Sequence, residues 1–132
     1  MIHPLTFFPL QGIVWHQGKS NLGSSDEYAD LFMSLIADWR DKWQKPQMPF
    51  YFVQLSNHGK KEEIQDDSDW AAIREAQAQA LHLNHTGMVV TTDIGKGKSN
   101  TFQSTLETGL RLSQLALKQT YGKRKMLLRH FS

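Results

Sequence analysis

The chain has 132 residues, a length that fits a single domain with a core of its own. Fifteen Lys and Arg residues stand against 13 Asp and Glu residues, and the net charge of +2 is too small to indicate a nucleic acid or a membrane surface as partner. The absence of cysteine excludes disulfides, thiolate nucleophiles and cysteine-based metal sites. The first ten residues contain two prolines and no basic region, so they predict neither a signal peptide nor a membrane helix.

The first half of the chain predicts a strand, a helix and a second strand. A short β-branched run predicts a buried strand at 12–16. Apolar residues then recur every three or four positions over 24–43, where Ser24 and Glu27 form a capping-box pattern, and Pro46 marks the end of the helix. The apolar stripe of this helix comprises Tyr28, Leu31, Phe32, Leu35, Ile36, Trp39 and Trp43. Residues 50–55 predict the second strand.

The second half repeats this alternation. A charged stretch at 60–69 predicts a solvated loop. A helix follows at 69–81, a strand at 87–93, a helix at about 104–120 that Gly122 ends, and a short last strand at 126–128. The first of these helices is expected to bury Trp70, Ile73, Ala76 or Gln77, and Ala80. The second is expected to bury Leu106, Leu110, Ser113, Leu117 and Tyr121.

Strands that alternate with helices predict a parallel sheet joined by right-handed crossovers, with helices on both faces. We therefore expect one domain over 1–132 with a three-layer α/β/α architecture. In such sheets the ligand crevice lies beyond the carboxyl ends of the strands.

Polar side chains and a glycine follow two of the predicted strands. After the first strand come Gln17, Gly18, Ser20 and Asn21, which we predict to bind the substrate or a developing oxyanion through the Gln17 amide and the backbone N–H of Gly18. Ser56-Asn57-His58-Gly59 follows the second strand. His16 and His58 lie near these strand ends and are candidates for a base, with structural or surface roles as the alternative.

The stretch Trp15-His-Gln-Gly-Lys-Ser-Asn21 resembles the Trp-Tyr-Gln-Gly-Glu-Ser-Asn segment of sialate O-acetylesterases, members of the SGNH-hydrolase superfamily. Lys19 stands where that family carries Glu. The resemblance continues, in order and with few gaps, through 28–54, 70–77, 86–95, 109–112 and 116–122. It implies a flavodoxin-like SGNH core that hydrolyses O-acetyl esters of sialic acid or other carbohydrates without a cofactor, in a secreted or periplasmic protein.

Catalysis in the resembled family uses a serine from a Gly-Gln-Ser-Asn-type turn and an Asp and His from an Asp-Ile-His-Pro segment. No serine precedes Gly12, so the first strand with its nucleophile would lie upstream of Met1. Ungapped counting puts Ser99-Asn100-Thr101-Phe102 in the Asp-Ile-His-Pro position, where Ser99 and Thr101 cannot replace an imidazole base. We therefore expect a catalytically incomplete domain in which Asn21 steadies the turn.

Two alternatives stay open. The chain could be a non-catalytic remnant that binds an acetylated sugar or a partner, and self-association through the surface of the missing strand is then expected. Gly95-Lys96-Gly97-Lys98-Ser99 follows a strand and suggests a phosphate loop, although Thr92 stands where the first glycine of that motif is required. His82 and His85 lack the spacing and the carboxylate of a zinc motif, so no metal site is predicted.

Overall fold

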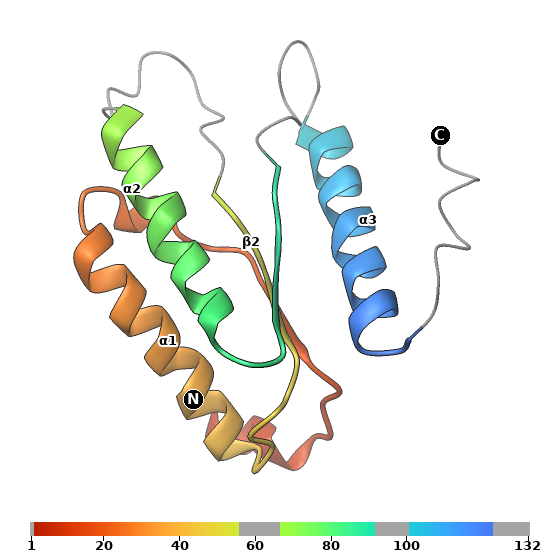
Figure 1. Ribbon diagram of the computed structural model, residues 1–132. Helices are drawn as coiled ribbons and strands as arrows, with labels where there is room; N and C mark the ends of the chain where they lie inside the picture. The colour runs from red at the N-terminus through yellow and green to blue at the C-terminus, as the bar shows by residue number, and fades with distance from the viewer. Residues whose placement is uncertain (1, 56–66, 92–100, 123–132) are drawn as a thin grey trace.

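The computed structural model describes residues 2–55, 67–91 and 101–122, and Figure 1 shows their arrangement. Its centre is a parallel sheet of three strands in the order β1-β2-β3. The strands are β1 (Ile13–Trp15), β2 (Phe50–Val53) and β3 (Thr86–Val89), and the helices are α1 (Ser25–Lys42), α2 (Asp67–Ala78) and α3 (Thr101–Gln119). Short 3₁₀ helices lie at η1 (His3–Phe7), η2 (Lys19–Asn21) and η3 (Gln79–His82).

Helices α1 and α2 lie on one side of the strands and α3 on the other, so the predicted α/β/α layers are confirmed (Figure 1). The core between the sheet and the first two helices is aromatic. Phe52 is fully buried and meets the Phe32 ring edge-on, with 5.0 Å between ring centroids. Trp15, the last residue of β1, packs edge-on against Trp39 of α1 at 5.7 Å. These contacts fix the carboxyl end of β1 against α1.

The buried face predicted for the helix at 69–81 is confirmed, although α2 ends at Ala78 and the last residue of that face, Ala80, lies in η3. Trp70, Ile73, Ala76, Gln77 and Ala80 are all buried. The sequence left Ala76 and Gln77 as alternatives, and the helix turns both of them inward. Gln77 thus places a carboxamide inside an otherwise apolar face, where it needs hydrogen-bond partners.

Helix α3 crosses β3 where Gly87 removes the obstacle of a side chain. A Cβ at Gly87 would lie 2.9 Å from side-chain atoms of both Leu115 and Tyr51. The Tyr51 hydroxyl also pairs with the Thr120 hydroxyl at 2.7 Å. The sheet therefore contacts the side of α3 that carries Leu115 and Thr120.

The predicted buried stripe of α3 is wrong at its ends and in its middle. Leu106 and Tyr121 are 53% and 55% exposed, and Ser113 is exposed as well. Leucines occur on several sides of this helix, so periodicity alone did not identify the side that packs. The close approach at Gly87 selects it.

Two local predictions for α1 are also wrong. Ser24 is the N-cap residue but makes no side-chain capping bond, because its backbone takes φ −123° and ψ 36°. Leu31, expected in the buried stripe, is 61% exposed. The helix ends at Lys42, earlier than Pro46 requires, and Trp43 donates a backbone bond back to Trp39.

The remaining differences concern element ends. Helix α2 begins at Asp67, inside the stretch predicted as a solvated loop, and α3 begins at Thr101 rather than near 104. Strand β3 is shorter than predicted, and η1 was not predicted. The predicted strand at 126–128 lies outside the described residues. Strand β1 forms one edge of the described sheet with Val14 57% exposed, and self-association at this edge stays a prediction.

Candidate functional site

The chain leaves β1 at Trp15 and folds into a turn beyond the carboxyl end of the strand. Within this turn the Gln17 Nε2 donates to Asn21 Oδ1 at 2.7 Å and to Ser20 Oγ at 3.1 Å. The Ser20 hydroxyl also lies 3.4 Å from Asn21 Oδ1 and donates to it. Three of the four predicted site residues therefore form one hydrogen-bonded cluster, and the fourth, Gly18, lies in the same turn.

Some N–H groups of this turn are hydrogen-bonded within the cluster, whereas others have no acceptor in the described part of the chain. A glutamine amide carries two N–H bonds, and both bonds of Gln17 are directed to its neighbours. By contrast, the backbone N–H of Gly18 meets no acceptor among the described residues. The Asn21 Nδ2 also has no acceptor in this part of the chain, because Asn21 takes part in the cluster through Oδ1 alone. These two groups are the donors that a ligand would find unused.

Two helices hold the turn from beneath. The Tyr28 hydroxyl of α1 donates to the carbonyl oxygen of Gln17 at 3.2 Å, and Gln77 Nε2 of α2 donates to the same oxygen at 3.1 Å. Gln77 Oε1 accepts from the backbone N–H of Leu55, just past β2, at 2.7 Å. The buried carboxamide of Gln77 thereby joins the ends of β1 and β2.

Sequence reasoning missed the roles of Tyr28 and Gln77. Both were assigned to apolar helix stripes without a partner. One signal was available for Gln77, because a carboxamide on the apolar face of a helix has to be satisfied by buried groups. Burial raises the pKa of Tyr28, and the nearby Gln77 side chain acts in the opposite direction. The phenol thus stays protonated at neutral pH and remains a donor.

Of the two candidate bases, only His16 lies within the described residues, and none of the hydrogen bonds of this cluster involves it. His16 follows β1 directly, but its side chain is exposed, and none of the hydrogen bonds at Ser20 involves an imidazole. His58, the other candidate, lies outside the described residues, as do Ser99 and the whole Gly95–Ser99 loop. Thr101 begins α3, and its side chain is likewise outside the described part.

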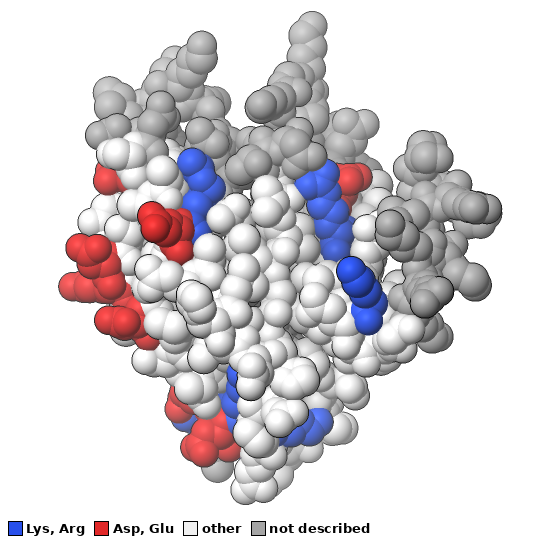
Figure 2. Space-filling view, in the orientation of Figure 1, with Lys and Arg blue, Asp and Glu red and all other residues white. Residues whose placement is uncertain are grey.

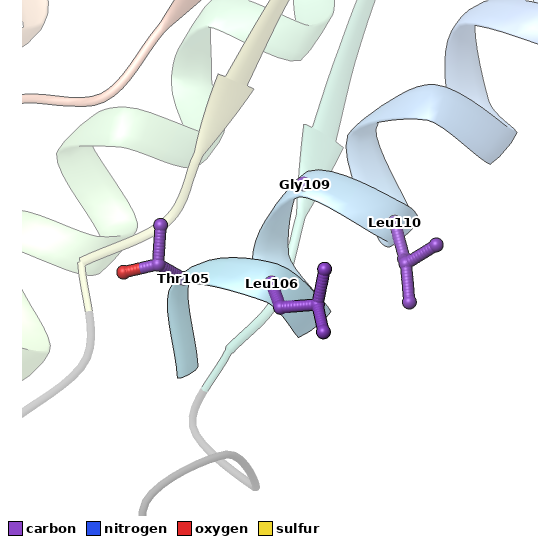
Figure 3. A pocket seen from close by; sticks show the side chains of 4 residues that line it. All are labelled: Thr105, Leu106, Gly109 and Leu110. Carbon is purple, nitrogen blue, oxygen red and sulfur yellow. The ribbon is translucent and has the colours of Figure 1, made fainter. Parts of the chain in front are cut away.

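No group of three or more His, Asp or Glu residues able to hold a metal occurs in 2–55, 67–91 and 101–122. Within the same ranges, no helix has the length and apolarity to cross a membrane. A hollow on α3 is lined by Thr105, Leu106, Gly109 and Leu110, which offer one hydroxyl between them (Figure 3). It belongs to a different element from the turn.

Comparison with known proteins identifies the class. A carbohydrate acetylesterase from Xanthomonas citri, known from its crystal structure, superposes with a TM-score of 0.76 and 34% sequence identity. That match covers 93% of this chain and 29% of the other. The layered fold is thus that of a carbohydrate esterase of the SGNH type.

Sequence comparison then gives the family. The model described as carbohydrate esterase, sialic acid-specific acetylesterase, matches residues 4–118, and the chain belongs to this family. Sialate O-acetylesterase of Homo sapiens is 39% identical over 74 residues, which are 50% of this chain and 14% of that protein. The Rattus norvegicus protein is 42% identical over 66 residues, or 44% of this chain and 12% of its own. This chain thus matches a small part of each relative.

Proposed function

We propose that this chain supplies the oxyanion side of a site that removes O-acetyl groups from sialic acid or a related carbohydrate. Hydrolysis of an ester places negative charge on the former carbonyl oxygen, and fixed N–H donors stabilise that charge. The observation that supports the proposal is the backbone N–H of Gly18, which faces no protein acceptor in the described part of the chain. The family assignment and the position of the turn beyond β1 agree with it.

We infer further that residues 1–132 by themselves turn over acetyl esters slowly. A serine nucleophile needs a base to take its proton, and the Ser20 hydroxyl is directed to Asn21 Oδ1, an amide oxygen that is not a base at neutral pH. The Asp-Ile-His-Pro position of the family is occupied by Ser99-Asn100-Thr101-Phe102. Loss of triad members lowers turnover by about 10⁴- to 10⁶-fold.

Release of acetate from purified protein tests the second inference. The substrates are an O-acetylated sialic acid and an aryl acetate, and we expect rates close to the uncatalysed background. Ser20→Ala and His58→Ala should leave those rates unchanged. Release well above background that disappears in either variant would show that this chain contains a complete esterase site.

Ligand binding tests the first inference independently of turnover. Titration of the ¹⁵N-labelled protein with an O-acetylated sialic acid should shift the Gly18 and Asn21 resonances, whereas the de-O-acetylated sugar should shift them less. If neither sugar perturbs the turn at millimolar concentration, the assignment of residues 17–21 to a carbohydrate site is wrong.

A further inference from the structure

Gln77 and Tyr28 share one acceptor at the base of the candidate site. The carbonyl oxygen of Gln17 receives an N–H from Gln77 at 3.1 Å and the Tyr28 hydroxyl at 3.2 Å. The two donors also lie 3.5 Å from each other. They come from different helices, and Gln77 and Tyr28 are only 1% and 4% exposed. The orientation of this carbonyl is therefore fixed by buried groups on two elements.

Fixing the carbonyl of Gln17 also fixes the N–H of Gly18. The two groups belong to one peptide unit, and a planar trans peptide directs its C=O and its N–H in opposite directions. No cis peptide occurs among the described residues. Because the carbonyl is drawn toward α1 and α2, the Gly18 N–H is directed away from both helices. It is the same N–H that lacks a protein acceptor in the described structure.

The packing at Gly18 supports a direct mechanical connection. A Cβ on Gly18 would lie 3.0 Å from Gln77 Nε2 and 3.7 Å from the Tyr28 hydroxyl. The backbone of the turn thus rests on the two side chains without an intervening group. Any shift of the Gln77 carboxamide is transmitted to the peptide that precedes Gly18.

Gln77 is suited to this task because a carboxamide both accepts and donates. Its Oε1 is held by the Leu55 N–H at the end of β2, and its Nε2 holds the turn after β1. The relative position of the two strand ends therefore sets the orientation of the Gln17–Gly18 peptide. A side chain that only donates or only accepts could not make both bonds.

We propose that Gln77, assisted by Tyr28, is a positioning residue that aims the Gly18 N–H at the acetyl carbonyl of the substrate. This inference rests on the proposed function, since it assigns the acetyl group as the ligand of that N–H. It assigns neither residue a contact with the substrate. Their effect is exerted through the Gln17–Gly18 peptide.

The test uses the full chain with two variants and one matched control. Gln77→Glu keeps an oxygen for the Leu55 N–H and removes the donor to the Gln17 carbonyl. Tyr28→Phe removes the second donor and keeps the ring that packs on Phe32. Gln79→Glu makes the same chemical change on the exposed side of the same region and serves as the control.

The readout is the ratio of dissociation constants for de-O-acetylated and O-acetylated sialic acid. We expect this preference to fall by about 3- to 10-fold in both variants and to stay at the wild-type value in Gln79→Glu. The dissociation constant of the de-O-acetylated sugar should change little. The Gly18 amide resonance should move in both variants and stay in place in Gln79→Glu.

Three results would separate the possibilities. Folded variants that keep the wild-type preference and the wild-type Gly18 resonance would overturn the positioning role. A parallel loss of affinity for both sugars would also overturn it, because general damage does not distinguish them. If the wild type binds neither sugar but the Gly18 resonance still moves in the variants, the contact is supported and the proposed function is wrong. Tyr28→Phe keeps the test usable if Gln77→Glu does not fold.

Discussion

The two ends of the sheet are held by different buried side chains. At the amino ends of the strands, Arg40 of α1 donates to the carbonyls of Met48 at 3.0 Å, Asn84 at 2.7 Å and His85 at 3.3 Å. At the carboxyl ends, Gln77 of α2 joins the Leu55 N–H to the Gln17 carbonyl. A cation thus holds one end and a neutral amide the other.

The difference follows from what each group can bind. A guanidinium has donors only, so it collects carbonyls, and its charge strengthens each bond. Burial lowers the pKa of Arg40, but an arginine guanidinium is effectively always protonated in proteins. The only non-glycine residues with positive φ in the described ranges, Gln44 at 54° and His85 at 57°, lie at this end. At the amino end one charged group thus holds three carbonyls, whereas at the carboxyl end a neutral amide orients the Gln17–Gly18 peptide.

Replacing Arg40 should have the largest effect on the free energy of unfolding. In Arg40→Met three carbonyls lose their donor in or near the core, and we expect the free energy of unfolding to fall by about 2–4 kcal/mol in urea titrations. The sugar preference of the folded fraction should not change. Lys42→Met is the matched control at the same helix end. Its exposed pair with Asp38 contributes at most about 0.5 kcal/mol.

Adding a methyl group at Gly18, at the carboxyl ends of the strands, should have an intermediate effect on stability. Gly18 has φ +155°, and its added Cβ would crowd Gln77 Nε2, so Gly18→Ala should lower the free energy of unfolding by about 1–3 kcal/mol. It should also weaken the preference for the acetylated sugar. Gly109→Ala, in α3 with open space around it, should instead stabilise by about 0.5–1 kcal/mol. If Gly18→Ala and Gly109→Ala change the free energy of unfolding equally, the close packing at Gly18 does not contribute to stability.

The smallest expected effect is the pH dependence of stability that Tyr28 contributes. Burial raises the pKa of Tyr28 above its ordinary value, so the unfolded chain releases this proton first as pH rises. The contribution of the neutral phenol is fully present below about pH 10 and is lost as pH rises through the raised pKa. Tyr28→Phe should cost about 1 kcal/mol at neutral pH, and the deficit should shrink above about pH 10.

Thermal unfolding measured from neutral to alkaline pH checks this prediction. Tyr121→Phe is the control, because Tyr121 is 55% exposed on the last turn of the described chain and should follow the wild-type curve. A constant difference between Tyr28→Phe and wild type across the whole pH range would show that the buried phenol carries no pH dependence of stability.

Periodicity was sufficient where one side of an element is clearly apolar. It identified the buried residues of α2 and η3, the strands β1, β2 and β3, and the polar turn that follows β1. It failed on α3, where leucines occur on several sides, and at Leu31, whose neighbours in the stripe are buried while it is not. The Ser24 capping box failed for a local reason, since the pattern specifies residue types and not the backbone angles that capping requires.

The sequence by itself determined the alternation of strands and helices, the family, and the residue types in the turn at 17–21, because these depend on neighbours along the chain. Only the tertiary structure decided what holds that turn. Gln77 and Gln17 are 60 positions apart, and they meet because parallel pairing brings the ends of β1 and β2 together beneath α2. Gln77, on an apolar helix face, thus supports the peptide that carries the Gly18 N–H. No pattern of neighbouring residues in the sequence could have predicted this contact.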